Sequence, residues 1–326
     1  MVITECISSL NAPTLEELGA VAGALGTTEV LIEKDWHVVQ VLALIAGIKF
    51  NGVTTVFSGG TSLSKAHNII RRFSEDIDFR CAQHETAGMS GGQLKKIRRI
   101  YFEHIIASLG RAGYRVIDRK VRDSYKSFIL DIEYPSIVAQ KADAGLRPDI
   151  QLEMSFHPIS LAAIVKPISS FVGQNRQAAP EAPAISCTDP VETGADKLAA
   201  LVWRLTSAHL EKRADVYKPE LMRHVHDLAA LETRLMEREA DFLSLAAQRI
   251  QSDMERGDLE DVGGVAQVIT TFLAAIEVRD FLPKDYQTFV DNYVFAPEGE
   301  RIKYPEARDA VIRLSRRVLA SIEYRK

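Results

Sequence analysis

The first half of the chain alternates between stretches with helical and with strand-like hydrophobic spacing. From residue 27 to about 48, apolar side chains recur at the three- and four-residue intervals of a buried helix. The β-branched run 53–58 then predicts a core strand, which ends in the tight turn Gly59-Gly60. A short helix is expected to follow over about 63–71.

The pattern then continues in the same mixed way. A long amphipathic stretch predicts a helix, and alternating or β-branched runs predict four more strands. The helix is expected over 93–112, and the strands over 77–81, 114–121, 127–134 and 149–156. Helices interleaved with strands in this order indicate an α+β fold built on a mixed sheet.

The second half has a different pattern. Five prolines and the stretch GQNRQAAPEAPA fall between residues 157 and 190, which predicts a linker or surface loop. Beyond it only helical spacing is found, over 191–209, 218–235, 237–255, 263–277 and 306–323. We therefore expect an α/β domain with N-terminal helices at 1–170 and a helical domain at 185–326.

Composition is that of an ordinary globular protein, with 46% hydrophobic and 26% charged residues. The three cysteines are far apart and form no CxxC pair, so neither a zinc knuckle nor a disulfide framework is expected. The N-terminus lacks a basic-then-apolar signal region, and no apolar run reaches the roughly 18 residues of a membrane helix. A cytoplasmic protein with no membrane partner is expected.

Charge is unevenly distributed along the chain. The net charge is −4, but residues 91–126 carry ten Lys or Arg against three Asp or Glu. This segment is therefore a candidate surface for a polyanion such as RNA. A solvated helix face and sheet edge explain the same charges about equally well.

Candidate chemistry begins where the strand 53–58 ends. Glycines at 59 and 60 allow backbone N–H groups to approach a ligand closely, at the start of a helix whose positive end favours phosphate. Hydroxyl donors and one positive charge follow. The expected nucleotide-binding residues are Ser58, Gly59, Gly60, Thr61, Ser62 and Lys65.

Two acids follow within one helix length of this turn. Asp76 and Asp78 are two positions apart, so on a strand both side chains leave the same face and repel each other. Divalent cations relieve such repulsion, and Mg²⁺ with oxygen ligands and substrate phosphates is the usual occupant. Glu153, on the strand 149–156, is expected beside them as a third carboxylate, and three acids can hold two ions.

Each of these signals alone has an ordinary explanation. A Gly-Gly pair before a helix is more often a turn, and an Asp-x-Asp pair or Glu153 is often a solvated strand residue. The order of strand, glycine turn, helix and acid pair favours function.

Several fragments together resemble the AbiEii/AbiGii-type nucleotidyltransferase toxins of the polymerase-β-like superfamily. The fragments are IEKDWHV at 32–38, FSGGTSLSKAH at 57–67, RRFSEDIDF at 71–79, DPVETGADKLAALVWR at 189–204 and RHVHDLAAL at 223–231. The resemblance implies that the Gly-Gly-Thr-Ser turn cradles a nucleoside triphosphate. It also implies that Asp76 and Asp78 are metal ligands, with Glu153 at the place of the third acid.

The resemblance further implies functional residues in the helical domain. Lys197 resembles a motif lysine that reaches the triphosphate, and Asp227 resembles the last acid of the Arg-Asp-x-x-Asp-Leu signature. His224 departs from the family, which usually has aspartate there. A snorkelling surface lysine is the ordinary explanation for Lys197. For residues 223–227 it is a hydrogen-bonded cluster between helices.

Two further groups of polar side chains have ordinary explanations. His224 and His226 are two apart on a helix and face different sides, which disfavours a zinc site. The charges at 33–35 resemble a helix-surface run, in which Lys34 alone is a candidate phosphate contact.

The sequence thus predicts a Mg²⁺-dependent nucleotidyltransferase that transfers NMP from an NTP to an acceptor, as the toxin of a toxin–antitoxin or abortive-infection system. The resemblance implies tRNA or another RNA as acceptor and a cognate antitoxin as partner. Two alternatives remain open: a protein adenylyltransferase or kinase-like phosphotransferase on the same scaffold, and a non-catalytic nucleotide- or RNA-binding protein.

Overall fold

The computed structural model describes residues 12–84, 86–138, 147–210, 217–257, 262–279 and 282–324. The chain divides into two compact units. The sheet unit comprises Met1–Asn68 and Phe73–Thr188, and the helical unit comprises Ile69–Arg72 and Asp189–Lys326. The chain therefore passes into the helical unit for four residues, returns, and enters it again after Thr188.

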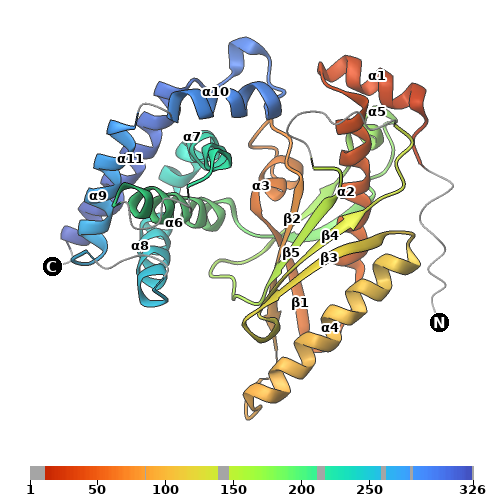
Figure 1. The fold of residues 1–326 in the computed structure, drawn as a ribbon, viewed down its shortest axis with the longest axis horizontal. Coiled ribbons are helices and arrows are strands. Elements are labelled where there is room, and N and C mark those ends of the chain that lie inside the picture. Colours follow the sequence, from red (N-terminus) through yellow and green to blue (C-terminus); the bar gives the residue numbers. More distant parts are fainter. Residues whose placement is uncertain are drawn as a thin grey trace. The chain divides into compact units, whose positions relative to one another are not determined.

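A mixed sheet of seven strands forms the sheet unit, in the order β3-β4-β5-β2-β1-β7-β6. Figure 1 labels β1 to β5 of this sheet. The strands are β1 Val53–Ser58, β2 Asp76–Gln83, β3 Arg115–Arg122, β4 Ser127–Glu133, β5 Ile150–Ser155, β6 Ile164–Ile168 and β7 Ala182–Cys187. The pairs β2–β5 and β1–β7 are parallel, and the other neighbours are antiparallel. The predicted α+β class with a mixed sheet is confirmed.

Alternation along the central strands separates a buried face of this sheet from a partly exposed one. In β2, Ile77 and Phe79 are buried, while Asp76 and Asp78, which alternate with them, are partly exposed. The buried face packs against α2 and α4 in one hydrophobic core. The helices of this unit are α1 Leu15–Leu25, α2 Glu29–Gly47, α3 Gly59–Thr61 with its continuation η1 Ser62–Ala66, α4 Gly91–Arg111 and α5 Phe171–Asn175.

Helix α2 buries three charged residues in succession. Glu33, Lys34 and Asp35 are 1%, 3% and 7% exposed, so the prediction of a helix-surface charge run is wrong. Glu33 accepts hydrogen bonds from the Ser136 hydroxyl and the Ile137 amide, both at 2.6 Å. Helix α2 is therefore buried, and its charged side chains form hydrogen bonds and ion pairs with the segments packed around it.

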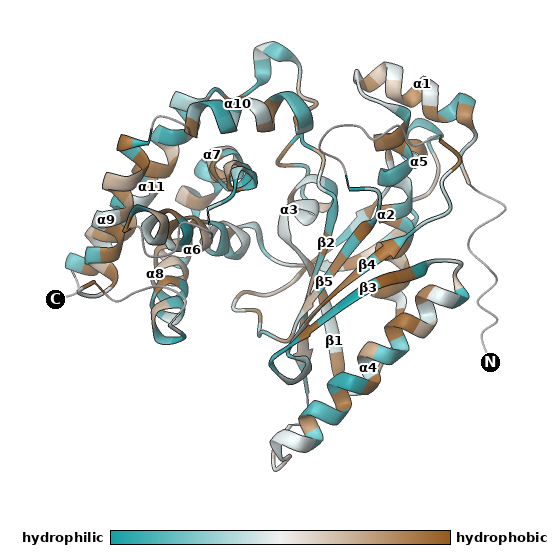
Figure 2. Cartoon of the chain, in the orientation of Figure 1, coloured by the Kyte–Doolittle hydropathy of each residue, from teal (hydrophilic) through white to brown (hydrophobic). Residues whose placement is uncertain are grey.

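The helical unit consists of amphipathic helices with buried apolar faces. Its elements are α6 Pro190–His209, η4 Pro219–Leu221, α7 Met222–Glu237, α8 Glu239–Glu255, α9 Val265–Val278, α10 Leu282–Tyr293, η5 Glu298–Glu300 and α11 Tyr304–Glu323. Figure 2 shows hydrophilic and hydrophobic residues alternating along them. Sequence spacing predicted all the long helices except α10, which has the polar sequence LPKDYQTFVDNY.

Two local predictions are wrong. The proline-rich segment 157–190 is not mainly a linker, because it contains β6, α5 and β7. Pro167 lies where the pairing of β6 with β7 shifts register, on an edge strand that tolerates a missing N–H. The helix expected to reach residue 71 ends at Ala66, and residues 69–72 join the helical unit instead.

Candidate active site

A glycine turn links the end of β1 to the first helical turn of α3. Gly59 has φ +74°, a left-handed conformation that favours glycine, and a Cβ added there would lie 1.8 Å from Asp78 Oδ2. The carboxylate of Asp78 thus rests directly against the backbone of this turn. The prediction that the acid pair adjoins the turn holds for Asp78 in this geometry.

Strand register brings the third acid into the same row. Asp78 pairs with Ser58 on β1 and with Glu153 on β5, so the three positions lie side by side across adjacent strands. Asp76 lies two residues earlier on the same face of β2. The acids expected beside the turn therefore come from two strands, β2 and β5, that are distant from each other in sequence.

Asp76 is held through its backbone and is approached by a cation. The Thr61 hydroxyl, from the first turn of α3, donates to the Asp76 carbonyl oxygen. The side chain of Asp76 is 20% exposed, and Arg147 Nη1 lies 3.9 Å from its Oδ1. The turn and the acid strand are thus joined at both acids, by Thr61 at Asp76 and by Gly59 at Asp78.

The donor chemistry fits a hard divalent cation. Two carboxylates project from one strand, and the Asp78 carboxylate occupies a space that any side chain at position 59 would fill. Among the described residues no three His, Cys, Asp or Glu side chains converge closely enough to hold a metal by themselves. Mg²⁺ commonly binds one or two carboxylates and completes its coordination shell with substrate phosphates and water. This acid pair can therefore supply all the protein ligands that a Mg²⁺ ion needs.

Lys34 supports the segment just before Asp76. Its ammonium forms a buried ion pair with Glu75 and donates to the Arg147 carbonyl oxygen at 2.8 Å. The Arg147 amide also donates to Glu75, at 2.9 Å. Lys34 therefore braces the entry to β2, and a phosphate contact by this residue stays a prediction.

Lys65 lies in a buried ion pair with Asp35 of α2, and its Nζ sits 3.5 Å from the centre of the Phe171 ring. Burial lowers the pKa of Lys65 and raises the pKa of Asp35, while the attraction between them opposes both shifts. The positive charge expected at the phosphate turn is thus matched by a local acid. Its role in nucleotide binding stays a prediction.

In the helical unit, Lys197 and Asp227 are brought together. Lys197 on α6 places its Nζ 2.8 Å from Asp227 Oδ2 on α7, and both side chains are at least 93% buried. Burial raises the pKa of Asp227, but the charges of Arg72 and Lys197 outweigh it and hold this pKa well below its usual value. Burial lowers the pKa of Lys197, partly offset by Asp227.

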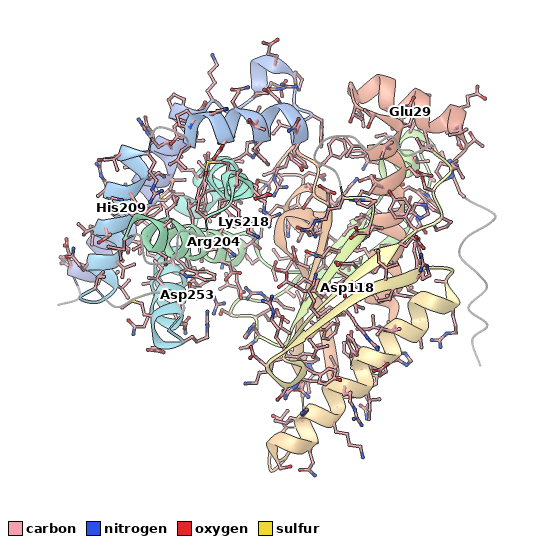
Figure 3. All side chains as sticks on the ribbon, in the orientation of Figure 1. Glu29, Asp118, Arg204, His209, Lys218 and Asp253 are labelled. Atoms are coloured by element: carbon pink, nitrogen blue, oxygen red, sulfur yellow. The ribbon has the colours of Figure 1, made fainter. Side chains whose placement is uncertain are left out.

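The histidines beside Asp227 differ in their surroundings. His226 Nδ1 lies 3.4 Å from Asp227 Oδ1, whereas the Nδ1 of His224 is buried without a hydrogen-bond partner. Burial, together with the charges of Lys197 and two neighbouring arginines, holds the pKa of His224 well below its usual value. A neutral imidazole thus occupies the position where the resembling family usually has an acid. Arg204, one of those two arginines, is labelled on α6 in Figure 3.

Sequence reasoning missed several residues that hold this arrangement together. Arg72 donates to both oxygens of Asp227, each at 2.7 Å. The Thr188 amide donates to the Phe57 carbonyl oxygen at 2.8 Å, and His67 Nε2 lies 3.0 Å from the Thr188 carbonyl oxygen. The available signal was the basic pair Arg71-Arg72 just before the acids.

An acid pair set against a glycine turn, at the ends of two central strands of a mixed sheet and followed by a helical unit, is typical of a nucleotidyltransferase. The family model described as "Nucleotidyl transferase AbiEii toxin, Type IV TA system" matches residues 43–312, and the chain belongs to this family. It is therefore a nucleotidyltransferase toxin of a type IV toxin–antitoxin system. Such enzymes generally use a nucleoside triphosphate and a divalent metal, and the family implies a cognate antitoxin.

Among solved structures, the fold is similar to that of MenT4, a nucleotidyltransferase toxin from Mycobacterium tuberculosis H37Rv. The TM-score is 0.54 at 17% sequence identity, over 94% of this chain and 98% of that chain. No curated protein matches the sequence. Within the described part of the chain, no helix is both long enough and apolar enough to cross a membrane.

Proposed function

We propose that this toxin transfers a nucleoside monophosphate from an NTP to a hydroxyl group of tRNA or another RNA, with two Mg²⁺ ions, in the cytoplasm. The observation that carries the proposal is the contact of the Asp78 carboxylate with the Gly59 backbone. A metal-binding acid and a phosphate-binding turn in direct contact suit a metal-bound triphosphate. Such ions supply charge neutralisation at the attacking and leaving oxygens.

The protein groups have distinct roles in this proposal. Asp76 and Asp78 would hold the metal ions, and Glu153, the register partner of Asp78 on β5, would supply the third carboxylate once the ions are bound. Backbone N–H groups of the turn that begins at Gly59 orient the triphosphate, while the Thr61 hydroxyl, which donates to the Asp76 carbonyl oxygen, holds the turn against the acid strand. Lys197 neutralises charge on the departing diphosphate, and the acceptor hydroxyl is oriented for attack on the α-phosphate.

A basic surface on the sheet unit supports an RNA acceptor. Exposed cations on the first half of α4 are Lys95, Lys96 and Arg99, and those at the β3–β4 hairpin are Arg122 and Lys126. Arg98 joins the two elements, because it donates to the Ser124 carbonyl oxygen of the hairpin at 3.2 Å and to Gln83 at 3.1 Å. These cations therefore share one end of the sheet unit, as RNA phosphate binding requires.

The experiment is incubation of the protein with each α-labelled NTP, Mg²⁺ and total RNA, followed by separation and sequencing of labelled RNA. Label on RNA is expected, and Asp76→Asn should lower its rate by at least about 100-fold. Asp131→Asn is the matched control, because Asp131 lies on the same face of the sheet, two strands away. Label on protein, or transfer only from γ-labelled NTP, would contradict the proposal in favour of an adenylyltransferase or a kinase.

The basic surface is tested in the same assay with Lys95→Gln/Lys96→Gln/Arg99→Gln. We expect weaker RNA binding with unchanged NTP binding, and a salt dependence of log K reduced by about 0.7–0.9 per lost phosphate contact. Lys284→Gln/Lys303→Gln, at exposed sites in the helical unit, is the control. RNA affinity equal to that of the wild type would remove the surface from the proposal.

A further inference from the structure

Four residues from the connection between the phosphate turn and β2 belong to the helical unit. The segment Ile69–Arg72 clusters with that unit, whereas Asn68 before it and Phe73 after it belong to the sheet unit. The Phe295 amide donates to the Arg71 carbonyl oxygen at 3.1 Å, and Arg72 forms a β-bridge with Val294. The segment is thus bound by backbone contacts to residues more than 220 positions later.

The side chain of Arg72 reinforces this attachment. Its guanidinium donates through Nε and Nη2 to the two oxygens of Asp227, each at 2.7 Å. Arg72 is 3% exposed and Asp227 is fully buried, and the Phe289 ring centre lies 5.8 Å from the guanidinium carbon. A bidentate, desolvated ion pair of this kind fixes the orientation of the Asp227 carboxylate as well as its position.

Asp227 serves a second cation at the same time. Its Oδ2 accepts from Arg72 and lies 2.8 Å from Lys197 Nζ, so one carboxylate oxygen holds both positive groups. The two cations repel, and the position of Lys197 depends on how much of the carboxylate Arg72 occupies. With Arg72 in place, Lys197 is held at one oxygen and keeps its remaining N–H donors.

We propose that Arg72 is a positioning residue for Lys197, acting through Asp227. This inference rests on the proposed role of Lys197 at the triphosphate. Only Phe73, Ser74 and Glu75 separate Arg72 from the acid strand, and Phe73 and Glu75 are themselves held in the sheet unit by Phe171 and Lys34. The ion pair therefore connects the lysine to the same stretch of chain that carries Asp76 and Asp78.

The test is a double-mutant cycle in the full-length protein, with kcat and KM for the NTP measured separately. Arg72→Lys keeps the charge but cannot reach both oxygens of Asp227. It should lower kcat by about 10- to 100-fold, since a shift of about 1 Å in a positioning group has effects of that size. KM for the NTP should change less than threefold. In a Lys197→Met background the same substitution should have no further effect on kcat.

Two variants keep this test decisive. Arg71→Gln removes the neighbouring arginine, which is 61% exposed and pairs with Glu300, and should leave kcat unchanged. Phe289→Leu removes the ring beside the guanidinium without removing charge, and should lower kcat moderately, again only when Lys197 is present. It substitutes for Arg72→Lys if that variant does not fold.

The outcomes separate the inference from the function on which it rests. Equal losses of kcat with and without Lys197 would overturn the positioning role, because Arg72 would then act independently. If the wild-type protein transfers no label to RNA, the proposed function fails, and the cycle is then run with the acceptor that is labelled. Non-additive losses for any acceptor support the positioning role.

Discussion

Gly59 satisfies two requirements at once, a left-handed backbone and an open space for the Asp78 carboxylate. Each requirement alone favours glycine, and together they exclude every side chain. Because the same atoms form the turn proposed to bind phosphate and seat the acid proposed to bind metal, a change here should alter nucleotide and metal binding together. Stability is affected less, since the turn lies at the end of one strand.

Gly59→Ala is expected to abolish transfer while lowering the free energy of unfolding by only about 1–2 kcal/mol, the cost of a left-handed alanine. Loss of activity follows because the new Cβ displaces the Asp78 carboxylate. Gly23→Ala in α1 is the control, since nothing lies within 4 Å of its added Cβ. That helical substitution should be neutral or stabilising by up to about 1 kcal/mol. Transfer assays and urea unfolding measure both, and an active Gly59→Ala enzyme would contradict the close contact.

His37 makes stability depend on pH. It is 6% exposed, with Nδ1 3.2 Å from the Tyr114 hydroxyl oxygen, and burial lowers its pKa to about 4. The unfolded chain has a His pKa of about 6.5, so it binds the proton more tightly than the folded protein. The resulting stability is complete above pH 6.5, decreases as pH falls towards 4, and is lost below that value.

The expected loss between pH 7 and pH 4 is about 3 kcal/mol, from a pKa difference near 2.5 and 1.36 kcal/mol per unit. His37→Phe should therefore flatten the dependence of unfolding free energy on pH in this window, even if it changes stability at pH 7. Urea unfolding at pH 7, 5.5 and 4.5 measures the slope, with His104→Asn at an exposed site as control. Parallel curves for His37→Phe and the wild type would refute this assignment.

At the scale of elements, α2 differs from an ordinary buried helix because its charged residues face inward. Asp35 accepts a hydrogen bond from the Phe171 amide at 2.8 Å and pairs with Lys65, which comes from the helix that follows the phosphate turn. Helix α2 thereby fixes both α5 and η1. The glycine turn therefore owes its position partly to α2.

Asp35→Asn should lower the free energy of unfolding by about 3–5 kcal/mol, because it leaves the buried Lys65 ammonium without an opposite charge. Asp35→Leu/Lys65→Met removes both charges and should be as stable as the wild type or more so. Activity then distinguishes two roles of Lys65. If the lysine only holds the helix, the stable double variant keeps its affinity for NTP. A rise of tenfold or more in KM would show that Lys65 also contacts phosphate.

The sequence pattern predicted those elements in which the buried side chains follow the spacing of apolar residues within the element itself. The alternation in β2, β4 and β5 identified each strand and placed Asp76, Asp78 and Glu153 on one face before their pairing was known. It failed where contacts between residues distant in sequence determine the local structure. Residues 69–72 leave their expected helix because Val294 and Phe295 bind them, and no local spacing encodes that partner. Strands β6 and β7 were not predicted, because Pro167 and Pro183 lie within them and the proline-rich segment resembled a linker.

Considered as a whole, the chain passes between the units at three points: after Asn68, after Arg72 and after Thr188. Each point is next to a fixed contact. His67 and Thr188 are bonded to each other, Arg72 is bonded to Asp227, and Asp189 caps α6 and pairs with Arg238. The hydrogen bond between His67 and Thr188 holds together the two chain segments that leave the sheet unit after Asn68 and after Thr188.

The helical unit is therefore incomplete without a segment from the first quarter of the chain. A fragment of residues 189–326 lacks Arg72, which leaves both oxygens of the buried Asp227 short of a donor. We expect it to be less stable than the helical unit of the intact chain by about 3 kcal/mol, the size of two lost charged hydrogen bonds. Asp227→Leu/Lys197→Met in the fragment should restore most of this, because the remaining charges no longer need a partner. Urea unfolding followed by helical circular dichroism makes the comparison. Equal stability of the unsubstituted fragment and the intact unit would mean that Arg72 contributes little to folding, and that its ion pair with Asp227 serves the positioning of Lys197 instead.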